Sequence, residues 1–200
     1  MVQKLFEPRC TLVMGMGSYK TGNMIKHIYL QLIGEQERVI WKALRFANDA
    51  RPKAQFTLWL QLHGRLLTAD RLLSWGMSID KKCSLCQLQD ETRNHLFMEC
   101  SYVKQVWDGL LKWMCRAAPV QTNWDQHISW IIRQSKGKSR KAHVFKLVYT
   151  EFVHAIWIER NGRIFEKKQK EYKQLIKEVT YISCVRATTR TKSLFQSFLL

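Results

Sequence analysis

Apolar residues recur every three or four positions along most of the chain, a spacing typical of amphipathic helices. The first such stripe lies within 23–34 and stops at Gly34, and a second covers 39–47 before Pro52 ends any continuation. Residues 54–76 carry two more helices and show no strand alternation. A break at Gly64 separates them, and the second begins at Thr68 as its N-cap and closes at Gly76.

Four further stripes follow the same period. One covers 103–114, a shorter one lies around 128–132, a long one runs from 144 to a glycine cap at Gly162, and the last begins near Glu171. The pattern therefore predicts a mainly α fold with a helical C-terminal region. Tryptophans on these stripes are expected in the core rather than on a stacking surface, namely Trp59, Trp75, Trp107 and Trp113.

Charge adds a candidate partner. Thirty-three Lys and Arg residues against 16 Asp and Glu give a formal net charge of +17, which favours polyanions and nucleic acid first, with a merely soluble basic surface as the alternative. The run QSKGKSRK at 134–141 is interpreted as an exposed linker. The predicted phosphate contacts lie there and beside the cysteine cluster: Lys81, Lys82, Arg93, Lys136, Lys138, Arg140 and Lys141.

No window approaches the roughly 18 uninterrupted apolar residues that cross a bilayer, and Glu7, Pro8 and Arg9 interrupt the N-terminal apolar stretch. We therefore expect a soluble, intracellular protein without a membrane partner. The run KGKSRK is compatible with nuclear import and equally with a surface linker. In a reducing compartment, the six cysteines are better explained by metal binding or burial than by disulfides.

Four residues follow the spacing C-x2-C-x8-H-x4-C, namely Cys83, Cys86, His95 and Cys100. The two-residue gap suits a tight knuckle in which both sulfurs face one tetrahedral zinc ion, and backbone N–H groups just beyond it donate to the thiolates. Four protein ligands leave no open position, so the site is structural rather than hydrolytic. The alternatives are a redox pair, which would need a βαβ context, and four unrelated buried residues.

The flanks of this motif complete the prediction. We expect Thr92 to cap a short helix that presents His95, and Ser101 to cap the next helix. One structural zinc would then join the helices Thr68–Gly76 and Ser101–Met114. Cys10, Cys115 and Cys184 are solitary and are predicted to be buried. His63 and His154 are read as packing or surface residues, and no catalytic constellation is found.

The segments PKAQFTLWLQLHGRLLTADRLLSWG, CSLCQLQDETRNHLFMEC and VW together resemble the reverse transcriptase zinc-binding domain family, from the C-terminal region of plant non-LTR (LINE-type) retroelement polyproteins. EFVHAIWIERNGRIF, at 151–165, resembles the stretch that follows that domain. The similarity covers about 41–115. We predict a loose leader (1–22), a helical zinc-binding domain (23–116), a connecting segment with the basic linker (117–142) and a helical C-terminal region (143–200).

The resemblance implies a zinc-binding region that lies downstream of a polymerase and contacts RNA or DNA, with the polymerase of the parent element as a further partner. No catalytic residue carries over and no Asp-Asp pair occurs, so the chain is expected not to be an enzyme. The x8 gap differs from the x4 gap of retroviral knuckles, whose base-stacking geometry is not transferred. A protein-interaction module and a functionless relic of a mobile element are the alternatives.

Overall fold

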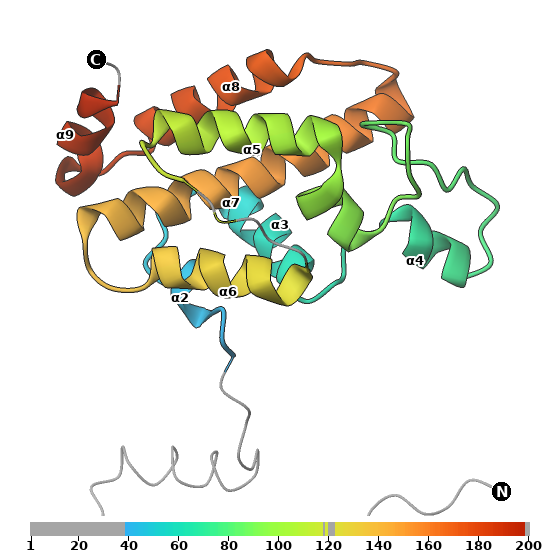
Figure 1. Cartoon of the computed structure of the whole chain (residues 1–200), viewed down its shortest axis with the longest axis horizontal. Coiled ribbons are helices and arrows are strands. Elements are labelled where there is room, and N and C mark those ends of the chain that lie inside the picture. The colour runs from blue at the N-terminus through green and yellow to red at the C-terminus, as the bar shows by residue number, and fades with distance from the viewer. Residues whose placement is uncertain (1–38, 118, 120–122, 199–200) are drawn as a thin grey trace, which may run out of the picture. The chain divides into compact units, whose positions relative to one another are not determined.

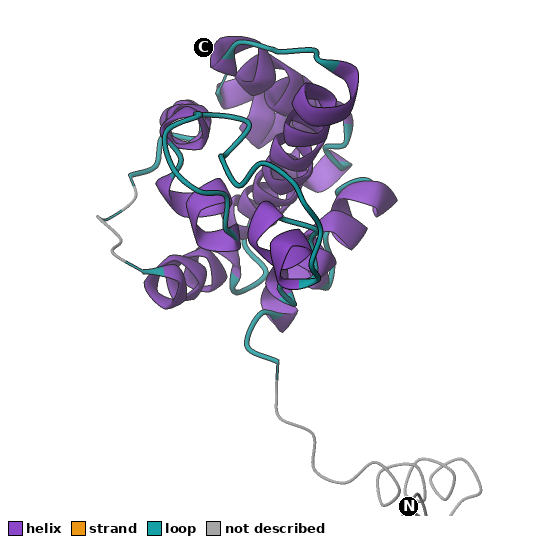
Figure 2. Ribbon diagram, turned by 90° about the vertical axis from the view of Figure 1, so that its right-hand side faces the viewer, coloured by secondary structure: helices purple, strands orange, loops and turns teal. Residues whose placement is uncertain are grey.

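The computed structural model describes residues 39–117, 119 and 123–198 (Figure 1). Within these ranges the secondary structure is helical and includes no strand beyond one isolated bridge between Lys82 and Asp90 (Figure 2). The prediction of a mainly α fold is confirmed. The expected helix over 23–34, the leader and Cys10 lie outside the described residues. Of the helix expected over 39–47, the structure has the short α2 (Lys42–Arg45).

Helix α7 (Arg140–Asn161) lies at the centre of the described unit. It packs against α3 (Pro52–Leu62), α5 (Ser101–Trp113), α6 (Trp124–Ser135), α8 (Tyr172–Val185) and α9 (Thr189–Ser197). In Figure 1, α5 and α8 lie above α7 and α6 lies below it, whereas α4 (Ala69–Ser74) stands apart near one end. All residues from Val144 to Val153 are buried. The sequence predicts an amphipathic helix here, but neighbours on several sides bury this stretch all round.

The core is centred on aromatic side chains of α7 and α5. The ring of Trp107 lies 4.8 Å from that of Phe152 and 5.5 Å from that of Tyr149, between centroids. Such pairs add about 0.5–1.5 kcal/mol each to the free energy gained from buried area. Trp107 is buried as predicted, and Trp59 and Trp113 are half-buried. Trp75 is 60% exposed, contrary to prediction, because the short α4 buries only Ala69.

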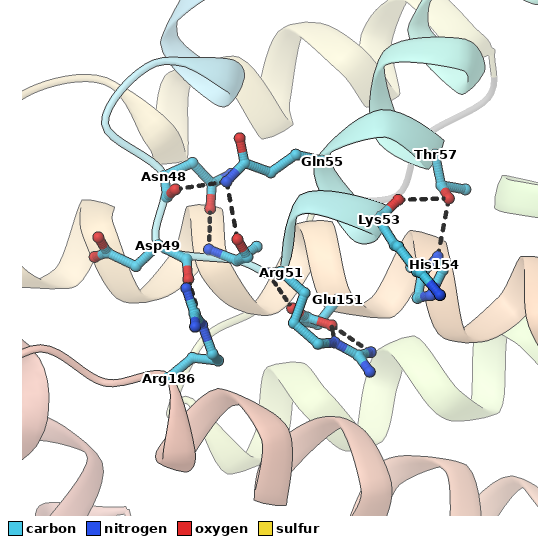
Figure 3. Close-up of polar contacts among 10 residues, drawn as sticks. Asn48, Asp49, Arg51, Lys53, Gln55, Thr57, Glu151, His154 and Arg186 are labelled. Carbon is cyan, nitrogen blue, oxygen red and sulfur yellow. Dashed lines mark hydrogen bonds and ion pairs between the residues drawn. The ribbon is translucent and has the colours of Figure 1, made fainter.

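Polar contacts fasten the loop between α2 and α3 to the centre of α7 (Figure 3). Arg51 donates its backbone N–H and the Nε and Nη2 of its guanidinium to the fully buried carboxylate of Glu151, at 2.7–2.9 Å. Asn48 donates to Thr150 Oγ1 at 2.7 Å, and Gln55 donates to two carbonyls of the loop. A buried carboxylate is tolerated only when it is paired in this way, so the ion pair fixes where α3 begins.

The boundaries of α6 and α7 differ from the predicted ones. Helix α6 extends to Ser135 and Ser139 caps α7 by accepting from the Ala142 N–H at 3.2 Å. The basic run is therefore a loop over only 136–139 followed by a helical turn. At the other end, α7 ends at Asn161 as predicted, but its C-cap Gly162 has φ −58° instead of the expected left-handed conformation. The chain continues through the π-helical turn η2 (Gly162–Glu166), and Lys167 takes the left-handed conformation instead.

Burial of His127 on α6 gives a prediction on pH. Its side chain is 3% exposed, and burial lowers its pKa to about 4. Because the unfolded chain binds this proton near pH 6.5, stability falls as pH decreases from about 6.5 toward 4. We expect His127 to account for a loss of about 1 kcal/mol between about pH 7.5 and pH 5.5. Urea unfolding at both values should show a smaller loss in His127→Gln, and equal losses would contradict the assignment.

Candidate metal centre

A small hairpin presents the first two cysteines. The Cys83 N–H donates to the Gln89 carbonyl at 2.8 Å, and the Glu91 N–H donates to the Lys81 carbonyl at 2.7 Å. Between these bonds the chain turns tightly, the Gln87 N–H donating to the Cys83 carbonyl at 2.8 Å with Gln87 at φ 60°. The turn brings the Cys86 side chain back beside Cys83, which is the knuckle expected from the two-residue spacing.

The structure brings the four predicted ligands together. The thiol sulfurs of Cys83, Cys86 and Cys100 and one ring nitrogen of His95 lie within 4.8 Å of one another. Cys83 Sγ lies 4.0 Å from Cys100 Sγ, and Cys86 Sγ lies 3.2 Å from His95 Nε2. A tetrahedral zinc with ordinary bond lengths separates two sulfurs by about 3.8 Å, and a sulfur from a nitrogen by about 3.5 Å. These spacings, and the burial of all but Cys86, fit a closed zinc site.

The His95 ring is held with Nε2 toward the cysteines. Its other nitrogen, Nδ1, lies 2.9 Å from Gln89 Oε1, which accepts the Nδ1–H and leaves Nε2 free to bind a metal. Thr92 Oγ1 accepts from the His95 N–H at 3.0 Å, as predicted for a cap. His95 also begins the π-helical turn η1 (His95–Glu99). Such turns are frequent at functional sites, and this one leads directly to Cys100.

Cys100 is the N-cap residue of α5, and Ser101 is its first helical residue. The predicted cap at Ser101 is therefore wrong by one position, and the Cys100 side chain makes no capping hydrogen bond to the first turn of α5. The hydrogen bond from Cys100, followed by those from the Cys86 and Leu85 N–H groups, lowers the pKa of Cys83 to about 5. The same Cys83 bond raises the pKa of Cys100. Cys83 is thus prepared as a thiolate ligand.

Arg163 in η2 binds the backbone of the knuckle that carries Cys83 and Cys86. Its guanidinium donates to the Leu85 carbonyl at 2.9 Å and to the buried Glu159 carboxylate at 2.7 Å, and it lies over the Tyr102 ring at 4.5 Å. Because these donors fix carbonyl groups between Cys83 and Cys86, Arg163 positions the ligands without binding metal. Sequence reasoning missed it, since only its place four residues after Glu159 hints at an ion pair.

Glu91 connects the hairpin to α4 and to α7. Its carboxylate accepts from Arg160 on α7 at 2.6–3.2 Å and from the Ala69 N–H at 2.9 Å, and its carbonyl accepts from the Asp70 N–H at 3.2 Å. Thr68 holds the N-cap position of α4, but its hydroxyl binds Asp70 instead of a backbone N–H. The four clustered side chains include none from α4. The sequence predicts that zinc joins this helix to α5, but Glu91 holds α4 in place instead.

The seven predicted phosphate contacts fall into two groups. Lys81 and Lys82 share the Asp90 carboxylate at 3.2 and 3.4 Å, and Lys81 foremost lowers the pKa of Asp90. Arg93 lies over the Trp124 ring at 4.6 Å. The other four lie in the α6–α7 loop (Lys136 and Lys138) and the first turn of α7 (Arg140 and Lys141). Arg160, near the end of α7, binds Glu91 beside the first group. The 20 helical steps from Arg140 to Arg160 span about 30 Å, so the two groups cannot form one compact contact.

The other cysteines and histidines within the described ranges are not part of the cluster. Cys115 is exposed, contrary to the predicted burial, because it lies just beyond the end of α5 with φ 52°; Cys184 is half-buried. His63 packs against Trp41 and Trp59, and His154 Nδ1 lies 2.9 Å from Thr57 Oγ1. Both histidines therefore have the packing or surface roles predicted for them.

Comparison with known protein families gives a match over part of the chain. Residues 24–107 match the family model described as zinc-binding in reverse transcriptase, and this range contains all four clustered side chains. No curated protein and no solved structure is significantly similar to the chain. Among the described helices, none combines the length and apolar composition of a bilayer span. Residues 24–107 thus match the zinc-binding domain of reverse transcriptases, and the four side chains clustered within this range form a structural zinc site.

Proposed function

We propose that the chain is a non-catalytic module of a retrotransposon reverse transcriptase polyprotein that binds RNA or DNA through basic residues, with Cys83, Cys86, His95 and Cys100 as its zinc ligands. Four protein ligands would fill the tetrahedral coordination of a zinc ion and leave no position for a reacting water. In this proposal the zinc site fixes the hairpin against α5, and nucleic acid binds to another part of the surface.

A basic patch at one end of α7 supports this function most directly. It comprises six exposed cations from the α6–α7 loop, the first turn of α7 and α9: Lys136, Lys138, Arg140, Lys141, Arg190 and Lys192. Arg140 donates to Ser193 Oγ at 3.2 Å, and Arg190 donates to the Lys138 carbonyl, so the two segments are in contact. Figure 1 shows α9 beside the start of α7.

The patch has no internal neutralisation. Neither 126–150 nor 179–200 contains an acidic residue, and none of the six cations is ion-paired within the part of the chain that the structure describes. Lys81 and Lys82, by contrast, already share a carboxylate. Phosphates that replace small counterions gain most where cations are concentrated and unpaired. We therefore place the main phosphate contacts at the basic patch.

The salt dependence of binding tests this placement. Replacing Lys136, Lys138, Arg140 and Lys141 by alanine should lower the slope of log affinity against log salt by about 3 for single strands. The matched control, Lys81→Ala with Lys82→Ala, should change the slope less because Asp90 already neutralises part of that pair. Fluorescence anisotropy with a labelled oligonucleotide gives both slopes. Absence of binding at low salt would refute the function and leave protein docking as the alternative.

A further inference from the structure

Helix α3 is apolar on two opposite faces. One face is buried against the rest of the unit through Ala54, Thr57, Leu58 and Gln61, with α7 as the main neighbour. The other face carries Phe56, which is 59% exposed, and the half-buried Trp59. A surface helix normally turns charged residues outward, yet Lys53 is the only charged residue of α3. The composition of the outward face is therefore typical of a binding surface.

The rings on this face form a continuous row, here called the aromatic surface: Phe56, Trp59, His63 and Trp41. Phe56 and Trp59 are stacked, with centroids 5.9 Å apart and planes 19° from parallel. Trp59 lies 4.7 Å from His63, which in turn meets Trp41 at 5.0 Å. Neighbouring rings fix one another's orientation, so Phe56 offers a flat aromatic face already held in place.

Two arginines flank the row. Arg65 lies over Trp59 at 6.0 Å. Arg93 reaches the row beside Gly64, the neighbour of His63. A Cβ at Gly64 would lie only 3.1 Å from Arg93 Nη1, so the absence of a side chain there leaves room for the guanidinium; Gly64 also has φ +61°. Neither guanidinium is ion-paired within the described ranges. The aromatic surface is thus bordered by cations whose charge is not already matched by a carboxylate.

We propose that the aromatic surface binds unpaired bases of a single-stranded nucleic acid, which stack on Phe56 and Trp59 while Arg65 and Arg93 contact the adjoining phosphates. The inference rests on the proposed function and specifies the kind of nucleic acid. A duplex hides its base faces, so an exposed row of rings gains nothing from it, whereas single strands are bound by aromatic side chains in positively charged grooves. An apolar protein partner would have no use for the flanking cations.

Anisotropy titrations of the full-length, zinc-loaded protein test this inference with single-stranded RNA and DNA of one sequence and with the corresponding duplexes. Phe56→Leu, which keeps apolar bulk but removes the ring face, should weaken binding to both single strands roughly tenfold and leave duplex binding unchanged. Phe56→Tyr keeps the ring and should retain affinity. Phe165→Leu is the matched control, because Phe165 is 76% exposed on η2 and should have no effect.

The outcomes separate this inference from the function on which it rests. Salt-dependent binding that does not distinguish single strands from duplexes, and that Phe56→Leu does not change, would overturn the stacking site and leave the basic patch standing. An equal loss of affinity for duplexes in Phe56→Leu would also overturn it. Zinc content and circular dichroism of Phe56→Leu must match the unsubstituted protein, and no binding to any strand at low salt would remove both proposals.

Discussion

Cys83→Ser and Cys100→Ser are each expected to abolish stoichiometric zinc binding and to unfold the hairpin and the start of α5. Zinc binding to small structural sites is worth about 10–16 kcal/mol in apparent free energy, which is as large as the whole stability of a typical domain, about 5–15 kcal/mol. Apart from the metal, the hairpin is held mainly by the contacts of Arg163 and Glu91. Two backbone hydrogen bonds close it, and of its residues 81–91 only Cys83, Leu85 and Glu91 are buried.

Metal analysis of the purified protein, combined with thermal unfolding before and after a chelator, measures both effects. The matched controls are Cys115→Ser, at an exposed cysteine, and Cys184→Ser, at a half-buried one; both variants should keep one zinc per chain. Unchanged zinc content in Cys83→Ser or Cys100→Ser would refute the ligand assignment. Zinc loss without a drop in the unfolding temperature would show that Arg163 and Glu91 hold the hairpin unaided.

The cluster could be predicted from the sequence because its geometry is mostly local. Cys83 and Cys86 share one turn, and His95 and Cys100 are separated by a single π-helical turn, so spacing alone brings each pair together. The groups that hold the cluster are not local. Arg160 meets Glu91 across 69 positions, and Arg163 meets Leu85 across 78. No helical period connects such residues, and a charged side chain on a helix is by default expected to face water.

The same long-range contacts explain why Gly162 does not adopt the left-handed conformation predicted for it. Glycine at 162 suggests a left-handed cap, but Arg163 binds Glu159 one turn earlier and two carbonyls of the knuckle, which favours one more turn. The division of the basic residues into two groups also depends on tertiary structure. Arg93 and Arg140 are both exposed enough to meet a phosphate, but the length of α7 separates their surroundings.

Glu91→Gln should produce the second large effect, a loss of about 3–5 kcal/mol in the free energy of unfolding. The substitution keeps the shape of the side chain and an oxygen for the Ala69 N–H, but it leaves the Arg160 guanidinium buried without its counter-charge. Both partners are almost inaccessible to solvent, at 1% and 4% exposure. Removing one member of a buried pair leaves the other desolvated and uncompensated, which is why such losses are large.

Urea unfolding of Glu91→Gln, Arg160→Met and the double variant measures this pair. The double variant should be more stable than the sum of the single losses predicts, because no unpaired charge remains when both groups are removed. Glu166→Gln is the control: its partner Lys168 is also within hydrogen-bonding distance, at 2.8 Å, but both side chains are exposed, so no measurable change is expected. Similar losses in Glu91→Gln and Glu166→Gln would mean that burial does not set the strength of the Glu91–Arg160 pair. A loss of stability in Glu91→Gln alone, with zinc retained, would instead show that two independent interactions hold the hairpin. The metal would attach it to α5, and the Glu91 carboxylate would attach it to α4 and α7.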